Sequence, residues 1–425
     1  MQRVKLIEKY YPTDFAYYLR VSGKFQEIFP ADLRRKKSPT PQNLRVFAEK
    51  SPTNSASICG EKRKKSASIC GKESLCLEVM SYHVSFPGGT VNYYFDRNFN
   101  FLSEIIAGRK AILITDNNIH SLYQSSFESY DTIVIPAGEL HKTLETLNYI
   151  TEQLIGFEAD RQTLLIGIGG GMVTDLTGFA ASVYMRGVKF GFVPTTLLGM
   201  VDAAIGGKNG VNFGLHKNML GTITQPEFLL FDQNFLQTLP DEEWSNGFAE
   251  VIKYGCIFDS FLFDKLLSND LSFFRNNLQG TKVLIQKCVE WKNKTVLEDE
   301  KEQANRKLLN FGHTVGHAIE QLHKMQHGYA ISIGMVVACR LSEKLTGLNE
   351  EVTKALKRVL VRYNLPIEIS FDANQIMSVL KMDKKRSNDE IDFIVLEGIG
   401  KARIEKISFD MIYETLIEYL HAGNH

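Results

Sequence analysis

The chain has few of the features that mark secreted or membrane proteins. Its six cysteines include no Cys-x-x-Cys pair, so neither a disulfide framework nor a cysteine metal site is implied. No run of about 18 apolar residues occurs, and no membrane span is therefore expected. Residues 1–20 lack the apolar core of a secretory signal. We expect a cytoplasmic protein without a membrane partner.

The formal net charge is zero, but the charges are unevenly distributed. Residues 1–79 contain 16 Lys and Arg against 8 Asp and Glu, whereas the remaining residues contain 33 against 41. A net-acidic main body argues against nucleic acid as a partner. It does not exclude an anionic substrate, because local basic residues decide that.

Residues 1–79 do not have the pattern of a folded domain. They contain two basic runs, several prolines and a short repeat, in which Ser55–Gly60 recurs as Ser66–Gly71. Such a composition is typical of disordered segments. We expect a disordered extension or a mis-assigned start, with Met80 as the true first residue. A basic interaction tail is the functional alternative.

Beyond Met80, short apolar runs alternate with amphipathic stretches. Strands are expected at 111–115, 131–135, 163–168, 188–193 and 228–231, with helices between them, as at 143–155 and 172–184. This alternation predicts an α/β fold with a Rossmann-like, doubly wound parallel sheet. Residues 241–380 have helical patterns almost throughout. We therefore predict a Rossmann-like domain over 80–239 and an all-helical domain over 240–425.

A glycine triplet, Gly169–Gly171, follows one of the expected strands and opens a helix. Glycines there let the backbone approach a pyrophosphate, and the helix N-terminus supplies N–H donors. Thr174 stands where the usual Gly-x-Gly-x-x-Gly pattern has glycine, so a plain tight turn is the alternative. Asp175 would bind a ribose or nicotinamide group, or merely cap the helix.

Histidines are concentrated between residues 313 and 327. His313 and His317 lie one helical turn apart, and a carboxylate from elsewhere would complete a three-ligand catalytic zinc site. Glu250 is the candidate carboxylate, although with Lys253 three residues later it could form a surface salt bridge instead. Histidines of an ordinary surface or core are the alternative to a metal site.

Other polar residues are spaced as if they belonged to one site. Arg306 and Asn310 precede His313 at helical spacing, which predicts one helical stripe with both histidines. Asp202 and Lys208 flank two glycines, and such a loop commonly brings a backbone and an ammonium group against a phosphate. A solvated loop lysine is the alternative.

These segments together resemble a known family. The matching segments are Pro136–Lys142, Gly169–Asp175, Tyr184–Gly187, Pro194–Leu198, Met200–Lys208, His216–Asn218, Ala249–Gly255, Asp299–Glu300, Leu309–His313, His327–Gly328 and Asp383–Lys385. In this order and spacing, residues 80–425 resemble the 3-dehydroquinate synthases, the zinc- and NAD-dependent cyclases of the shikimate pathway. Residues 1–79 are not part of the resemblance.

The resemblance implies roles for individual residues. The implied ligands of Zn²⁺, for which Co²⁺ could substitute, are Glu250, His313 and His327. The implied catalytic residues are Asp202, Lys208, Lys253, Arg306, Asn310 and His317. The implied substrate contacts are Arg186, Lys217, Asn218, Lys292, Lys384 and Lys385. The implied NAD contacts are Asp116, Glu139, Lys142, Gly169, Gly170, Gly171, Asp175, Thr195, Thr196, Lys208, Lys217 and Thr238.

The resemblance also implies the reaction and the partners. NAD would bind to the 80–239 domain, and zinc and substrate to the 240–425 domain. The substrate, 3-deoxy-D-arabino-heptulosonate 7-phosphate, would be oxidised transiently by NAD, lose phosphate and be reduced again. An intramolecular aldol step would then close 3-dehydroquinate. A homodimer is implied, in which Arg186 reaches the phosphate bound by the partner.

Two other functions compete with this interpretation. One is another sugar phosphate cyclase, such as one that uses sedoheptulose 7-phosphate. The other is a non-catalytic scaffold protein built on the same fold.

The chain departs from the family pattern at four places. Thr174 replaces glycine, Ala203-Ala204 replace two serines, and Asn209 stands where threonine is frequent. Tyr329 follows His327-Gly328 where glutamate is usual. An acid at that position would orient a zinc ligand, so we expect this support to be missing.

Overall fold

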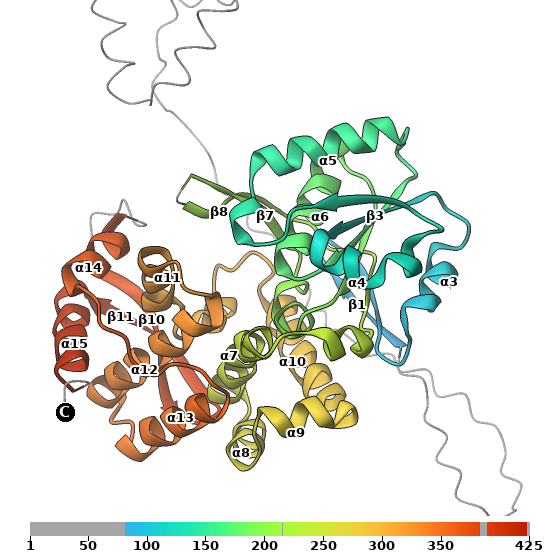
Figure 1. Ribbon diagram of the computed structural model, residues 1–425. Coiled ribbons are helices and arrows are strands. Elements are labelled where there is room, and N and C mark those ends of the chain that lie inside the picture. Colours follow the sequence, from blue (N-terminus) through green and yellow to red (C-terminus); the bar gives the residue numbers. More distant parts are fainter. Residues whose placement is uncertain (1–80, 215, 383–388, 423–425) are drawn as a thin grey trace, which may run out of the picture. The chain divides into compact units, whose positions relative to one another are not determined.

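The structure is a computed structural model that describes residues 81–214, 216–382 and 389–422 (Figure 1). All described residues belong to one compact unit. The extension predicted for residues 1–79 lies outside the described residues, and so do Lys384 and Lys385.

A seven-stranded sheet dominates the first part of the described chain. Across the sheet, the strands are β1 (Ser81–Phe86), β2 (Gly89–Tyr94), β9 (Phe228–Leu230), β6 (Phe190–Pro194), β5 (Leu164–Gly169), β3 (Ala111–Asp116) and β4 (Asp131–Ile135). Neighbouring strands are parallel except for the antiparallel pair β1–β2. All five predicted strands are present, and the predicted doubly wound parallel sheet is confirmed.

Hydrophobic clusters cover both faces of the sheet. Successive side chains of a strand point to opposite faces and therefore enter different clusters. In β3, Ile112 belongs to the larger hydrophobic cluster and Leu113 to the smaller one. Helix α4 (Asn117–Phe127) contributes to the smaller cluster and α6 (Gly171–Val183) to the larger. Helix α6 approaches strand β5 closely at Gly167, which has no side chain. A Cβ there would lie only 2.8 Å from the hydroxyl oxygen of Thr177 in α6.

A separate hairpin of β7 (Lys208–Phe213) and β8 (His216–Ile223) packs beside α6 and was not predicted. Gly178 of α6 makes room for it, since a Cβ there would collide with the side chain of Asn209. The Asn209 amide donates to two backbone carbonyls, at 2.8 and 3.0 Å. This departure from the family pattern therefore has a structural role, which is to hold the base of the hairpin.

Helices dominate after residue 240. They are α7 (Asp241–Phe258), α8 (Ser260–Ser268), α9 (Leu271–Asn276), α10 (Leu278–Glu298), α11 (His313–His323), α12 (His327–Thr346), α13 (Glu350–Arg362), α14 (Ala373–Met382) and α15 (Phe409–Ala422). The shorter or earlier helical elements are η1 (Phe99–Phe101), α3 (Leu102–Ile106), η2 (Glu139–His141), α5 (Leu144–Gly156), η3 (Tyr184–Arg186), η4 (Gly199–Ala203), η5 (Gln233–Thr238) and η6 (Asn305–Asn310).

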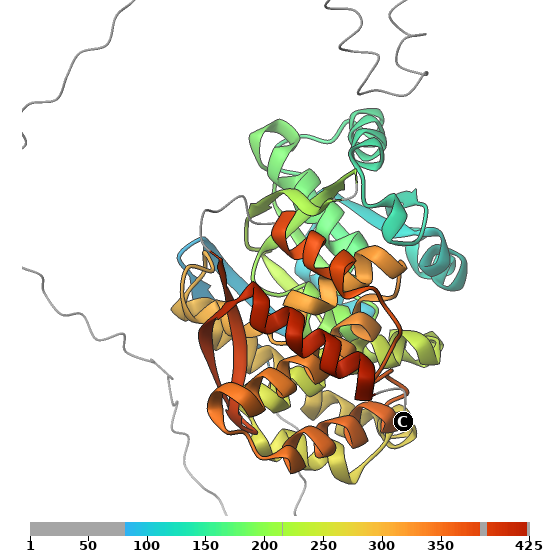
Figure 2. The same ribbon diagram turned by 90° about the vertical axis from the view of Figure 1, so that its left-hand side faces the viewer.

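The second part of the chain is largely helical rather than all-helical. An antiparallel hairpin, β10 (Glu390–Gly398) and β11 (Lys401–Ser408), corrects the prediction, and α15 packs beside β11 (Figure 2). Ile391, Phe393 and Val395 alternate along β10 and are buried, because α12 covers this strand.

The predicted domain boundary between residues 239 and 240 stays a prediction, because one large hydrophobic cluster runs from the sheet into the helices.

Among the helices of the described residues, none combines the length and apolar character that crossing a membrane requires.

Helices α11 and α12 approach each other closely at glycines. A Cβ at Gly334 of α12 would collide with the carbonyl oxygen of Gly312 and lie 2.8 Å from the nitrogen of Gly316. We predict that Gly334→Ala destabilises the protein by about 1–3 kcal/mol, as overpacking does. Gly156→Ala is the control, because a Cβ at Gly156 of α5 meets no atom within 4 Å. Urea unfolding compares the two variants, and equal stabilities would contradict the prediction.

Candidate active site

Several candidate residues lie at the carboxyl ends of the parallel strands. Asp116 ends β3 and caps α4, accepting hydrogen bonds at 2.9 Å from the backbone nitrogens of Asn118 and Ile119. Gly169 ends β5, and its carbonyl accepts a hydrogen bond from the nitrogen of Thr195, just beyond β6, at 2.9 Å. The strand order reverses between β3 and β5, and such a point forms a crevice in which doubly wound sheets bind ligands.

The glycine turn opens onto this crevice without a side-chain cap. Helix α6 begins at Gly171, and its N-cap residue Gly170 offers no side-chain oxygen to the first turn. A Cβ at Gly170 would lie 3.1 Å from Thr196, so the backbone lies close to the next strand end. The buried hydroxyl of Thr195 has no hydrogen-bond partner. This arrangement fits a bound pyrophosphate.

Thr174 does not obstruct the turn. Its side chain is buried, and its hydroxyl donates to the carbonyl of Gly171 at 3.0 Å. This departure from the glycine pattern is therefore satisfied within the first turn of α6.

A polar network joins the hairpin β7–β8 to α6. The ammonium of Lys142 contacts Asp175 Oδ2 and Asn218 Oδ1, both at 2.5 Å. Glu139 accepts a hydrogen bond from the amide of Asn212 at 2.9 Å. Four residues expected around NAD and substrate are thus brought together. Asn212 was missed, because it lies outside every matching segment.

Three predicted metal ligands converge from three helices, α7, α11 and α12. Glu250 Oε1 lies 3.4 Å from His313 Nε2 and 3.2 Å from His327 Nε2. The candidate ligand atoms all lie within 4.8 Å of one another. Glu250 is fully buried, and its Oε2 forms an ion pair with Lys253. A buried carboxylate and two imidazole nitrogens directed at one point fit a divalent cation such as zinc.

Buried charges of alternating sign continue from Glu250. Lys253 Nζ lies 3.7 Å from Asp202 Oδ1, Lys292 Nζ lies 2.9 Å from Asp202 Oδ2, and the Tyr254 hydroxyl donates to Oδ1 at 2.7 Å. Burial acts to raise the pKa of Asp202, but the ammonium groups of Lys292 and Lys253 outweigh it and hold the pKa at about 2. Burial lowers the pKa of Lys292 to about 8, because Asp202 offsets only part of the desolvation.

The predicted stripe of four residues on one helix is wrong. Arg306 and Asn310 lie in η6, and the chain turns at Gly312, with a φ of 78°, before α11 begins. Only His313 and His317 share a helical face, with ring centroids 5.1 Å apart.

Arg306 reaches the site from η6 as a buried side chain. It is 2% exposed, and its guanidinium donates to the carbonyls of Glu300 at 2.6 Å and Gly206 at 3.0 Å. Gly206 has a φ of +92°, and a Cβ there would lie 2.8 Å from the guanidinium. Gly206, one of the two glycines between Asp202 and Lys208, therefore leaves the space that the Arg306 guanidinium occupies.

Lys208 and Asn310 meet at Glu302, which the sequence analysis missed. Asn310 Nδ2 donates to Glu302 Oε1 at 3.0 Å, and Lys208 forms an ion pair with Glu302 Oε2. Two residues expected to be catalytic thus come together from β7 and η6.

Glu320 of α11 is a second residue that was missed. Its carboxylate pairs with Lys217 at 2.5 Å and lies 3.4 Å from His327 Nδ1. Its spacing of seven residues from His313 was an available signal, because it places both on one face of the helix.

Two predicted residues form no hydrogen bond or ion pair with this cluster among the described residues. Arg186 is exposed in η3, and within the described residues it forms no hydrogen bond or ion pair with the site. The hydroxyl of Thr238 in η5 instead bonds with that of Tyr123 at 2.8 Å.

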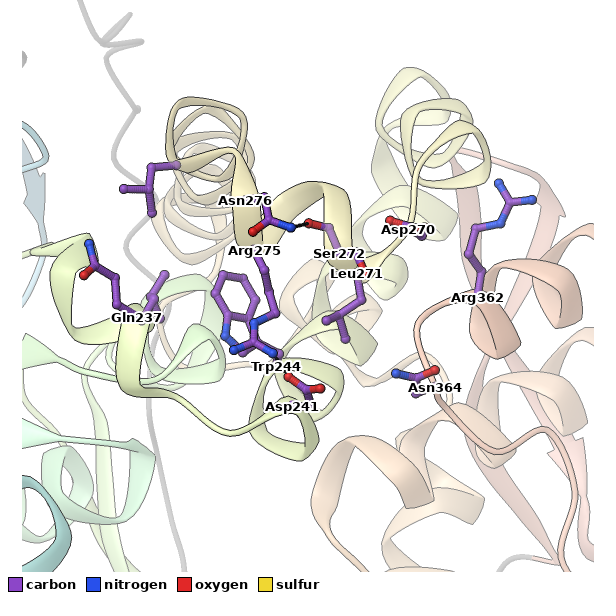
Figure 3. A pocket seen from close by; sticks show the side chains of 12 residues that line it. Gln237, Asp241, Trp244, Asp270, Leu271, Ser272, Arg275, Asn276, Arg362 and Asn364 are labelled. Atoms are coloured by element: carbon purple, nitrogen blue, oxygen red, sulfur yellow. Dashed lines mark hydrogen bonds and ion pairs between the residues drawn. The ribbon is translucent and has the colours of Figure 1, made fainter.

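A hollow of about 520 Å³ lies elsewhere and contains none of the predicted site residues (Figure 3). Its lining includes Asp241, Trp244, Asp270, Arg275 and Arg362. An ion pair joins Arg275 to Asp241 across the elements that line it. We assign the chemistry to the converging histidines and buried charges instead, because they combine candidate metal ligands with buried cations and the described lining of this hollow does not.

Comparisons with known proteins decide the family. The model of the 3-dehydroquinate synthase N-terminal region matches residues 132–246, and that of the C-terminal region matches residues 247–386. The chain belongs to the 3-dehydroquinate synthase family. A 3-dehydroquinate synthase of Pyrococcus furiosus is 40% identical over 323 residues, which cover 74% of this chain and 93% of the relative. That of Pyrococcus abyssi is 44% identical over 290 residues, covering 67% and 84%. The predicted function as a 3-dehydroquinate synthase is thereby confirmed.

Solved structures extend this family to other sugar phosphate cyclases. ValA, the 2-epi-5-epi-valiolone synthase of Streptomyces hygroscopicus subsp. jinggangensis with NAD⁺ and Zn²⁺ bound, is 26% identical with a TM-score of 0.71. It covers 80% of this chain and 98% of its own. A 2-deoxy-scyllo-inosose synthase complexed with carbaglucose-6-phosphate, NAD⁺ and Co²⁺ is 25% identical with a TM-score of 0.71, covering 80% and 100%.

Proposed function

We propose that the converging residues convert 3-deoxy-D-arabino-heptulosonate 7-phosphate to 3-dehydroquinate and phosphate. The observation that carries this proposal is the meeting of Glu250, His313 and His327 with buried cations beside a glycine turn. Glu250, His313 and His327 would hold Zn²⁺, or Co²⁺ in its place, and the crevice from Asp116 to Gly171 would hold NAD. When bound, the ion supplies a Lewis acid for a substrate hydroxyl, and NAD accepts and returns a hydride.

The chain's own residues bind and orient the anionic substrate. We assign Arg306 to the substrate carboxylate, because a planar guanidinium matches a carboxylate in two hydrogen bonds. The more exposed Lys208, with Asn310 and His317, is assigned to phosphate and hydroxyl oxygens. Asp202 stays ionised, since its pKa is about 2, so it would accept hydrogen bonds rather than act as a strong base.

Substrate choice tests this proposal. With NAD and Zn²⁺, we expect the full chain to release phosphate from the heptulosonate phosphate and not from sedoheptulose 7-phosphate, which lacks the carboxylate. We expect Arg306→Ala to lower kcat/KM for the heptulosonate phosphate roughly 30-fold to 5,000-fold, because truncating a buried charge partner costs about 2–5 kcal/mol.

Arg403→Ala is the matched control, because Arg403 lies on the partly exposed strand β11, among Glu397 and Glu405. Thermal unfolding shows whether each variant is folded. Turnover of sedoheptulose 7-phosphate would instead indicate another sugar phosphate cyclase. No turnover of either compound by folded, zinc-loaded protein would indicate a scaffold.

The pH dependence of kcat/KM should follow the charge state of Lys292. Its pKa is lowered to about 8 by burial, against the attraction of Asp202 and with repulsion from Lys253 and Arg306. Lys292 is therefore charged below pH 8 and loses its charge as the pH rises through that value. We predict that kcat/KM falls above pH 8, approaching about tenfold per pH unit.

Two variants check this assignment. Lys292→Arg keeps its charge at high pH, so the fall of kcat/KM above pH 8 (the alkaline limb of the pH profile) should move to higher pH. Lys294→Ala, at an exposed position of the same helix, should leave the limb in place. An unmoved limb in Lys292→Arg would assign it to another group.

We further propose that the enzyme is a homodimer whose interface includes the hairpin β7–β8 and the end of α6. Phe213, Met219, Ile223 and Met185 are apolar, yet 44–57% exposed. The hairpin and η3, which carry these residues, both contact α6, and apolar groups exposed on adjoining elements can form an interaction surface. Arg186 directly follows Met185 and, among the described residues, forms no hydrogen bond or ion pair with its own chain's site, which supports a role in the partner's site.

Mixing two inactive variants tests the shared site. Arg186→Ala and His317→Ala homodimers should each be inactive, and random exchange of subunits should restore about one quarter of the wild-type activity. The restored site combines His317 of one subunit with Arg186 of its partner. If light scattering shows dimers and exchange restores nothing, Arg186 does not act across the interface.

A cytoplasmic location is the last part of this proposal. The described cysteines, Cys256, Cys288 and Cys339, are free and buried. Free thiols are usual in a reducing compartment.

A further inference from the structure

Both ring nitrogens of His327 face a carboxylate. Its Nε2 lies 3.2 Å from Glu250 Oε1, toward the proposed metal position, and its Nδ1 lies 3.4 Å from Glu320 Oε2. A histidine that binds a metal through Nε2 carries its proton on Nδ1, and that proton needs an acceptor to fix the ring. Glu320 occupies the place of this acceptor.

Glu320 is built into the structure between two helices and a hairpin. It is 4% exposed and lies on the face of α11 that also presents His313 and His317. Its other oxygen, Oε1, accepts a hydrogen bond from Lys217 Nζ at 2.5 Å. A continuous path therefore runs from Lys217 on β8, through Glu320, to His327 at the start of α12.

The two histidine ligands differ in how they are oriented. His313 Nδ1 lies 3.1 Å from the carbonyl oxygen of Phe311, a neutral backbone acceptor close to it in the chain. The acceptor beside His327 Nδ1 is instead an ionisable side chain, that of Glu320. Lys217 joins Glu320 to the hairpin β7–β8, which contacts the nucleotide half of the site. The residue after His327-Gly328 is Tyr329, which offers no carboxylate there.

We propose that Glu320 is a positioning residue that orients His327 for the metal and couples it to Lys217. The inference rests on the proposed function, because it takes Glu250, His313 and His327 as the metal ligands. Coupling of this kind is reciprocal, so a group that draws Lys217 away from Glu320 would weaken the hold on the metal.

Metal affinity of the full chain tests the proposal without turnover. Metal-free protein is titrated with Co²⁺, followed by its visible absorption, and with Zn²⁺ in competition with a chromophoric chelator. We expect Glu320→Gln to weaken both affinities about 10-fold to 100-fold, as loss of an outer-shell partner does. Lys217→Met should weaken them less. The double variant should bind no more weakly than Glu320→Gln, because the path from Lys217 runs through Glu320.

Glu350→Gln is the matched control, since Glu350 is exposed on α13 and pairs only with the exposed Lys354 among the described residues. It should bind both metals as the wild type does. Circular dichroism and unfolding of the metal-free variants show that the fold is kept. Lys217, which is partly exposed, provides a variant that folds even if Glu320→Gln does not.

Two results would overturn the proposal. One is a Glu320→Gln protein, or if that fails to fold a Lys217→Met protein, with affinities within twofold of the wild type. The other is a double variant whose loss is the product of the two single losses, because independent effects multiply. A wild type that binds neither metal would contradict the proposed function instead, so the two failures are distinguishable.

Discussion

The site depends on the buried sequence of alternating charges from Lys292 through Asp202 and Lys253 to Glu250. Each of these groups is removed from water, which costs several kcal/mol per ion, and each is tolerated only because an opposite charge lies beside it. The four residues come from α10, η4 and α7, so the pairing fixes these three elements relative to one another. Glu250, the proposed metal ligand, is therefore held in place by a series of charges that ends at Lys292.

This arrangement places the candidate site among buried residues of the helical region. Glu250, Lys253 and Tyr254 all lie in α7, and each is at most 1% exposed. An apolar replacement of the same shape would avoid the desolvation of these groups. Their presence in a core helix is a local conflict with packing, and such conflicts concentrate where a protein binds or reacts. The same desolvation lowers the pKa of Lys292 to about 8, well below the value of an exposed lysine.

The sequence predicted what depends on local pattern. The strands β3 to β6 and β9 were found because buried parallel strands are continuous apolar runs. The hairpin β7–β8 was not, because β8 is exposed along most of its length and lacks that pattern. Likewise, β10–β11 was hidden by the helical patterns around it. The stripe from Arg306 to His317 failed at Gly312, whose positive φ ends one element and starts another at nearly helical spacing.

Each site residue that was missed has at least one partner distant in sequence. Glu320 pairs with Lys217, 103 positions away, and no spacing rule can reveal such a contact. The departure at Tyr329 shows the consequence. From the sequence alone, the absence of an acid at residue 329 predicts that the ring of His327 lacks a carboxylate to orient it. In the fold, α11 approaches α12 closely at Gly316 and Gly334. This approach brings the Glu320 carboxylate of α11 to 3.4 Å from His327 Nδ1. A ligand's support is therefore a property of helix packing, and a substitution next to the ligand in sequence does not by itself remove it.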